Sequence, residues 1–160
     1  MTWQRGRETV DRLLEMRELE RVQPSEAVAD RLLSDARAHL ASADSIVATD
    51  APGALQLAYD AARKACTALL ATQGLRPTTS GGHVAVQTAI EEQFNGPSGV
   101  QSFARFSRLR RRRAASEYPA DMTTPTVDVD EARSGIDVAT QIVDDADRLL
   151  RSGRLTVFGP

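Results

Sequence analysis

The sequence predicts an all-α protein, an up-and-down bundle of five to six helices that forms one domain. Three observations support this fold class. Ala and Leu dominate the apolar residues, and aromatic residues make up only 4% of the 160 positions. That composition favours helices over sheets. Apolar residues also recur at spacings of three and four along long stretches, and the alternating Val, Ile and Tyr runs typical of strands are almost absent.

The N-terminal region, residues 1–24, is expected to carry one helix over Arg7–Val22. Its apolar residues are mixed with charge in an untidy stripe, so we expect this helix to dock loosely on the rest of the chain. Pro24 breaks the helix, and Ser25 is a plausible N-cap for the next one. The main bundle should then occupy residues 25–152.

Two long helices, over Glu26–Thr49 and Gly53–Gln73, should form an antiparallel hairpin because only a short turn with Pro52 separates them. Alanine dominates the apolar seam of the second helix, which lets two helix backbones approach closely. The stripe of the first helix is Val28, Leu32, Ala36, Leu40, Ala43 and Val47, and the seam of the second is Leu55, Ala58, Ala62, Ala65 and Leu69.

The second half of the chain begins with a predicted loop over Arg76–Gly82, a short helix over His83–Phe94 and a linker over residues 95–99. An arginine-rich helix follows. A last helix begins at Thr126 or Asp128, and Gly153 ends it, which leaves residues 153–160 as a tail that is a candidate for disorder. Expected apolar contacts are Val84, Ala85, Thr88, Ala89 and Phe94 in the short helix, and Ile136, Ala139, Val143, Ala146 and Leu150 in the last one.

Several function classes lack support in the sequence. The single cysteine, Cys66, allows no internal disulfide, and His39 and His83 stand without a second metal ligand at a diagnostic offset. Gly81-Gly82 lacks the spacing and the lysine of a phosphate-binding loop. We therefore expect no cofactor and no metal. The charged N-terminus and the absence of a long apolar run favour a cytoplasmic protein without a membrane span.

Positive charge is concentrated in the stretch Phe103–Pro119, although the formal net charge of the chain is -2. Such a concentration is typical of proteins that bind phosphate, nucleic acid or an acidic protein face. Pro119 should end the helix near Tyr118. The stretch holds six of the 20 Lys and Arg residues, which are Arg105, Arg108, Arg110, Arg111, Arg112 and Arg113.

Helical spacing divides these arginines between faces. Three of them share one face, and two lie together on another. A buried stripe is expected between the faces, at Phe103, Phe106 and Leu109. Because like charges this dense repel one another, some must line a cleft or an interface; the alternative is a solvated face, for which Glu117 is the only local partner. The first face carries Arg105, Arg108 and Arg112, and the second carries Arg110 and Arg113.

The order of elements resembles the HEPN domains (higher eukaryotes and prokaryotes nucleotide-binding). The resemblance depends on the helix segment Ala58–Pro77, the loop and short helix after it, and an arginine-rich helix that ends in Ser116–Tyr118. It implies a helical bundle. Many members are metal-independent ribonucleases that act as dimers, with their signatures meeting in one cleft, and many are toxins paired with a nucleotidyltransferase antitoxin or parts of defence systems.

The family signature is an arginine, then four to six residues, then a histidine, often followed by one further residue and a tyrosine. With Tyr118 as the anchor, the arginine falls on Arg111 and the histidine position is occupied by Ser116. A serine hydroxyl cannot exchange a proton near neutral pH as an imidazole does. Either catalysis is lost, or another group such as Tyr118, Glu117 or His83 serves.

Two hypotheses follow. The first is a HEPN-like homodimer that binds RNA or a nucleotide in a basic cleft and acts as a metal-independent ribonuclease, in a toxin–antitoxin or defence system. The second is a catalytically inactive interaction module that docks an acidic partner or a nucleotidyltransferase. Each site residue also has a plain structural role open to it, such as a half-buried helix end for Tyr118 or helix-start packing for His83. The candidate catalytic residues are Arg111, Arg112 and Tyr118, and the candidate substrate-binding residues are Arg105, Arg108, Arg113, Ser116 and His83.

Overall fold

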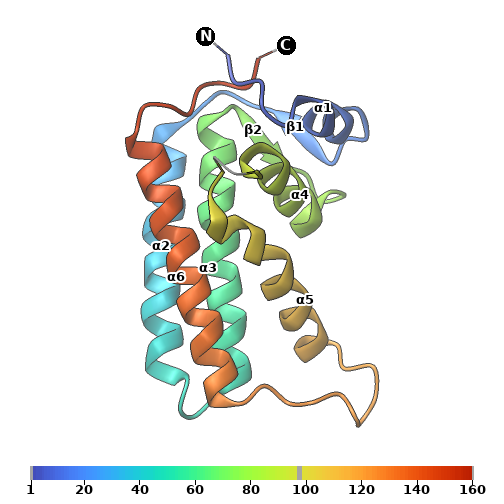
Figure 1. The fold of residues 1–160 in the computed structure, drawn as a ribbon, viewed down its shortest axis with the longest axis vertical. Helices are drawn as coiled ribbons and strands as arrows, with labels where there is room; N and C mark the ends of the chain where they lie inside the picture. The colour runs from blue at the N-terminus through green and yellow to red at the C-terminus, as the bar shows by residue number, and fades with distance from the viewer. Residues whose placement is uncertain (1, 97–98, 160) are drawn as a thin grey trace.

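A computed structural model describes residues 2–96 and 99–159 and confirms the all-α bundle (Figure 1). The predicted linker over residues 95–99 falls partly outside the described residues, at positions 97 and 98. Within the described part no helix is both long and apolar enough to cross a membrane. The elements are α1 (Arg7–Glu15), β1 (Leu19–Arg21), α2 (Glu26–Ile46), α3 (Ala51–Thr72), β2 (Leu75–Pro77), α4 (Gly82–Phe94), the 3-10 turn η1 (Gln101–Arg105), α5 (Phe106–Glu117) and α6 (Val129–Arg151).

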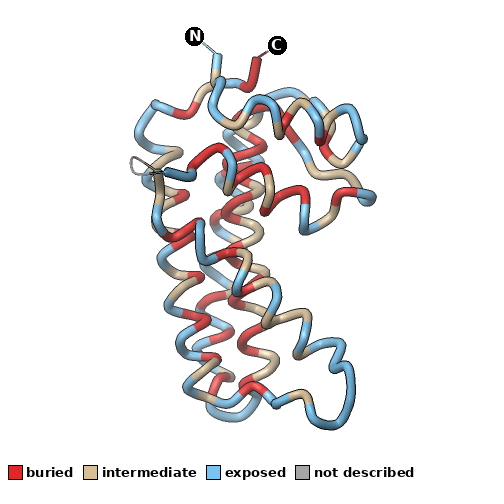
Figure 2. The backbone as a smooth tube through the Cα atoms, turned by 45° about the vertical axis from the view of Figure 1, so that its right-hand side comes forward, coloured by how far each residue is buried: buried red, intermediate tan, exposed pale blue. Residues whose placement is uncertain are grey.

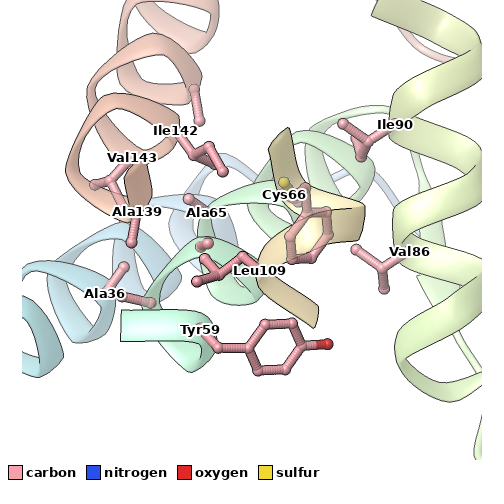
Figure 3. Close-up of a cluster of buried hydrophobic side chains, with 14 of the residues drawn as sticks. Ala36, Tyr59, Ala65, Cys66, Val86, Ile90, Leu109, Ala139, Ile142 and Val143 are labelled. Carbon is pink, nitrogen blue, oxygen red and sulfur yellow. The ribbon is translucent and has the colours of Figure 1, made fainter. Parts of the chain in front are cut away.

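Three long helices, α2, α3 and α6, lie side by side and form the main body of the molecule (Figure 1). The alanine seam of α3 is buried as predicted, and alanines from all three helices meet in the core, where Figure 3 shows Ala36, Ala65 and Ala139. Small side chains at these positions let the helix backbones approach closely. The larger side chains of the core then fill the space toward α4 and α5, as Figure 3 shows for Ile90 and Leu109.

The predicted stripe of α2 is right from Ala36 onward and wrong before it. Val28 is 49% exposed and Leu32 is half-buried, whereas Ala29 and Leu33 are buried. Each step of four residues turns a face by about 40° on an ideal helix. The two successive steps of four before Ala36 therefore carry Val28 away from the core, and a step of three keeps Leu33 in it.

The N-terminal helix is shorter than predicted. It ends at Glu15, and Arg17 adopts a left-handed backbone with φ of 57°, which turns the chain into strand β1. Strand β1 pairs antiparallel with β2, whose last two residues fall in the segment predicted as a loop. Each strand has only three residues, so the alternation that puts Leu19 and Leu75 inside is too brief to recognise in the sequence.

Both ends of the chain pack onto the same end of the molecule (Figure 1). Helix α1 buries Val10 and Leu13, so it is not loosely docked. The tail after α6 is also held in place, since Leu155 and Phe158 are buried and the Phe158 N–H donates to the Gln73 carbonyl at 2.9 Å. The tail has only three apolar residues, Leu155, Val157 and Phe158, which are too few to give a periodicity.

Helix α5 runs obliquely down one side of the bundle, and an exposed loop leads from its end to α6 (Figures 1 and 2). The arginine-rich stretch is helical as predicted, but its first turn is the 3-10 turn η1. The predicted stripe of Phe103, Phe106 and Leu109 is buried. Only Phe106 and Leu109 are buried within α5 itself, so most of its side chains are available for polar contacts.

Candidate functional site

The arginines of α5 and its preceding turn point in three directions. Arg110 and Arg113 face α3 and α4, while Arg105, Arg108 and Arg112 line a groove against α6. Arg111 is exposed on the outer side of the helix. The division into two flanks follows the faces predicted from helical spacing.

The ring of Tyr59 on α3 is the platform for the first flank. The Arg113 guanidinium carbon lies 5.4 Å from the centre of this ring, and the His83 imidazole of α4 lies 5.5 Å from it. Phe106 of α5 stacks on the same ring at 5.7 Å. Figure 3 shows the Tyr59 side chain extending from α3 toward α4. One buried aromatic ring therefore brings a histidine and an arginine from two other helices together.

Two further arginines complete a group that we call the His83 cluster, defined as Tyr59, Arg63, His83, Arg110 and Arg113. Neutral amides orient two arginines of the cluster. Arg110 Nε donates to Gln87 Oε1 at 2.5 Å, and Arg113 Nε donates to Gln56 Oε1 at 2.6 Å. Amide acceptors fix a guanidinium without neutralising its charge.

The cluster has more cations than carboxylates. Arg113 pairs with Glu117 at 2.5 Å, and Arg63 pairs with Asp60 at 2.5 Å. Lys64 lies 3.9 Å from the same Asp60 carboxylate. Three cations thus share two carboxylates, and Arg110 contacts a neutral amide, so the surface keeps an excess of positive charge that can attract an anion.

Asp60 fixes Arg63 within the cluster. It accepts two bonds from Arg63 on one oxygen, and its other oxygen lies 2.8 Å from His39 Nδ1 on α2. Burial opposes the ionisation of Asp60, but the hydrogen bond and charge of Arg63, with Lys64 and His39, lower its pKa below the usual value. The carboxylate is therefore ionised at neutral pH and holds the Arg63 guanidinium in one orientation.

The environment keeps the His83 imidazole neutral. Partial burial, and then the positive charges of Arg63, Arg113 and Arg110, lower its pKa below 6.5, against the opposing charge of Asp60. His83 is nevertheless exposed to solvent at the surface of α4. A neutral, accessible imidazole beside guanidinium groups can accept a proton from a molecule that binds to those cations.

Tyr59 itself is a structural platform. Its side chain is 1% exposed, and burial raises the pKa of its phenol to about 12 despite the nearby arginines. The hydroxyl is buried and has no hydrogen-bond partner among the residues that the structure describes. A neutral ring with a negative face attracts the Arg113 guanidinium that lies over it.

The residues aligned with the HEPN signature, Arg111, Ser116 and Tyr118, do not join the His83 cluster, and neither does Arg112. Arg111 is exposed, and Tyr118 is 72% exposed rather than half-buried. Arg112 turns to the other flank and forms a bidentate pair with Glu131. Ser116 is half-buried and lines a shallow cavity of about 240 Å³ beside the loop after α5. Of the residues singled out from the sequence as catalytic or binding, His83 and Arg113 meet in the cluster.

Sequence reasoning did not single out Tyr59, Asp60 or Arg63 as site residues. A signal was present, because these residues interrupt a helix that is otherwise rich in Ala and Leu. Polar and aromatic side chains in such a helix need a partner or a function. Nothing in the sequence indicates that Gln56 and Gln87 accept hydrogen bonds from the arginines, since a single glutamine is ordinary on a helix surface.

Comparisons with known proteins identify no relative: no family model, no curated protein and no solved structure matches this chain. Across residues 2–96 and 99–159 there is also no group of three or more His, Cys, Asp or Glu residues placed to hold a metal ion. The chemistry of the His83 cluster is therefore the main indication of function.

Proposed function

We propose that this protein binds RNA or a nucleotide through the His83 cluster and cleaves RNA without a metal ion. The observation that carries the proposal is the position of His83: an exposed imidazole, with its pKa lowered, among the guanidinium groups of Arg63, Arg110 and Arg113. Arginine suits phosphate binding because its planar guanidinium can donate two parallel hydrogen bonds to phosphate oxygens.

The chemistry follows from these groups. With a phosphate of the RNA backbone on Arg63 and Arg113, the neutral His83 imidazole takes the proton of the adjacent 2′-hydroxyl. The 2′-oxygen then forms a bond to phosphorus, and the bond from phosphorus to the 5′-oxygen breaks. The leaving 5′-oxygen takes a proton from water, so the products are a 2′,3′-cyclic phosphate and a 5′-hydroxyl. The guanidinium groups stabilise the negative charge that develops on the phosphate oxygens.

The proposal includes the HEPN-like assignment and its expected setting in a toxin–antitoxin or defence system. In this assignment His83 supplies, from α4, the imidazole that position 116 lacks. A homodimer also belongs to the proposal. Its support is the resemblance to the HEPN domains, many of which act as dimers.

An interaction module without catalysis is the second candidate. It is favoured by the outer side of α5, where Arg111 is exposed and forms no ion pair within the described residues, and where Tyr118 is 72% exposed. An arginine and a tyrosine at a surface are typical anchors of a protein interface. In this case an acidic partner, such as a nucleotidyltransferase, would cover the outer face of α5.

One assay separates the two candidates. Purified protein is incubated with a mixed-sequence single-stranded RNA in excess EDTA, and a His83→Gln variant and an Arg111→Gln variant are purified and assayed in parallel. The proposal predicts cleavage by the wild type and by Arg111→Gln but not by His83→Gln. Cleavage that is equal in all three preparations indicates a contaminating nuclease and contradicts the proposal. Absence of both cleavage and salt-dependent RNA binding favours the interaction module.

A further inference from the structure

The groove on the other flank of α5, which we call the α5–α6 groove, is a separate feature. It has a volume of about 510 Å³ and lies between α5 and α6 over the edge of α3. That volume is in the usual range for sites that hold a small molecule. Its lining residues are Leu55, Arg105, Arg108, Leu109, Arg112, Glu131, Ser134, Gly135 and Val138.

The floor of the groove is apolar. Leu55 and Leu109 are buried beneath it, and Val138 is half-buried along its side. At Gly135 there is no room for a side chain, because a Cβ atom at this position would lie 2.6 Å from Leu55 Cδ1. The absence of a side chain at Gly135 lets α6 pack closely on α3, and an aliphatic chain can contact the floor that remains.

Cross-helix bridges close both ends of the groove. At one end Arg112 pairs with Glu131 and also donates from Nη2 to the Pro125 carbonyl at 3.0 Å. At the other end Arg105 Nη1 donates to Gln141 Oε1 at 3.1 Å. The two partners on α6 are ten residues apart, which is about 15 Å along a helix. The groove is therefore a bounded site rather than an open channel.

The cations at the groove differ in what neutralises them. Glu131 neutralises Arg112 through two hydrogen bonds. Arg105 contacts a neutral amide, and Arg108 is exposed and forms no hydrogen bond or ion pair with any residue that the structure describes. Two positive charges thus stand beside an apolar floor with no carboxylate of their own.

We propose that the α5–α6 groove binds a small amphiphilic carboxylate, with its anionic head on Arg105 and Arg108 and its aliphatic body on Leu55, Leu109 and Val138. This site is distinct from the His83 cluster, on the opposite flank of α5, and it does not rest on the proposed cleavage of RNA. A carboxylate and two guanidinium groups form charge-assisted hydrogen bonds. The aliphatic body removes apolar surface of the floor from water.

The geometry favours a small molecule over a polymer. A peptide or an RNA strand would have to leave the groove at its ends, where the Arg112–Glu131 and Arg105–Gln141 bridges lie. The lining also contains no aromatic residue on which a base could stack. A molecule with one charged end and a short apolar body fits both the length and the lining.

Binding can be tested with octanoate as the probe, by NMR of the amide groups of the full chain and by calorimetry. Acetate carries only the head, octanol only the body, and octylammonium the opposite charge. The proposal predicts saturable binding of octanoate, with shifts at Leu109, Gly135 and Val138, and much weaker binding of the other three. Equal binding of octanoate and octylammonium would show nonspecific adsorption and overturn the proposal.

Variants then place the site. Arg108→Gln should weaken octanoate binding about tenfold, as expected for one charge-assisted hydrogen bond. Arg111→Gln, one turn along on the outer face of α5, is the matched control and should leave binding unchanged. Val138→Phe fills the groove and should abolish binding while the thermal unfolding curve confirms that the variant is folded. Unchanged binding in Arg108→Gln and Val138→Phe, or displacement of octanoate by single-stranded RNA, would overturn the proposal.

Discussion

The two flanks of α5 contain the same residue type in different chemical surroundings. Arg112 and Arg113 are adjacent in the sequence, yet Arg112 pairs with Glu131 on α6, whereas Arg113 pairs with Glu117 of its own helix and lies over the Tyr59 ring on α3. The α4-facing flank has an imidazole and several guanidinium groups in one cluster. The α6-facing flank has guanidinium groups above an apolar floor.

This difference shows that the partners of an arginine, and not its place in a charged run, decide what it can do. On the α4-facing flank partial burial and then the cations lower the pKa of His83, so the cations help to prepare a base as well as attract an anion. On the α6-facing flank no histidine lines the groove, and the groove can hold a ligand without acting on it. Five predictions test the contrast, from the largest expected effect to the smallest.

His83→Gln should have the largest effect. Removal of a general base lowers a cleavage rate by about 10²- to 10⁴-fold. The affinity for RNA should change little, because the arginines remain. Cleavage rate and affinity are measured separately, with labelled RNA in EDTA and with a 2′-O-methyl RNA that cannot be cleaved. A parallel loss of affinity and rate would mean that His83 serves binding alone.

Arg113→Gln and Arg112→Gln form a matched pair of neighbours on opposite flanks. Loss of a charge-assisted phosphate contact should reduce the RNA affinity of Arg113→Gln by about tenfold. Arg112→Gln should retain most of its affinity, because Arg112 lies on the other flank of α5, where Glu131 and the Pro125 carbonyl hold it away from the His83 cluster. Fluorescence anisotropy at fixed ionic strength gives both values. The contrast between the flanks fails when the two variants lose the same affinity.

The pH dependence of cleavage should report the environment of His83. A base whose pKa is lowered below 6.5 is already deprotonated at neutral pH, so the rate should rise with pH only in the acidic range and then level off. Arg113→Gln removes a charge that lowers this pKa, so its inflection should move to higher pH. Arg112→Gln should show the wild-type profile. If the inflection lies at the same pH in all three proteins, the charge of Arg113 does not lower the pKa of His83, which would contradict the prediction.

The same group gives a small effect on folding. Since the pKa of His83 is lowered in the folded protein, the unfolded state binds more protons below about pH 6.5. The free energy of unfolding should therefore decrease as the pH falls through that range, and His83→Gln should lose this component. Because His83 is exposed, solvent screening keeps the component small. Urea titrations of both proteins at several pH values measure it.

The Arg112–Glu131 bridge should contribute the least. For a partly exposed ion pair we expect a coupling free energy of about 0.5–1 kcal/mol. A double-mutant cycle of Arg112→Gln and Glu131→Gln, followed by urea unfolding, measures it. RNA cleavage should stay unchanged in all three variants. A large loss of cleavage would connect the two flanks and contradict their separation.

Long periodic segments were the predictable part of the fold. The alanine seam of α3 and the stripe of α6 through Ile136, Ala139 and Val143 were identified because many turns of one helix repeat the same signal. The three-residue strands and the buried Phe158 of the tail were missed. They depend on contacts between distant segments, for which no local pattern exists.

The positive charge of the candidate site could be predicted from the sequence, but the residues that contact its arginines could not. Helical spacing gave the two flanks of α5 and placed Arg110 with Arg113. It could not show that Tyr59 lies beneath them, because α3 and α5 meet only after the chain has folded. His83 was one of three groups considered as a substitute base, and tertiary structure brings it beside the arginines.

The most direct test of the account is the pKa of the His83 imidazole, followed by NMR in the free protein and in complex with 2′-O-methyl RNA. The account predicts a pKa below 6.5 in the free protein. It also predicts a rise when RNA binds, because phosphate charge beside the ring favours the imidazolium form. A pKa that does not change on saturation with RNA would place the bound phosphate elsewhere and contradict the proposed site.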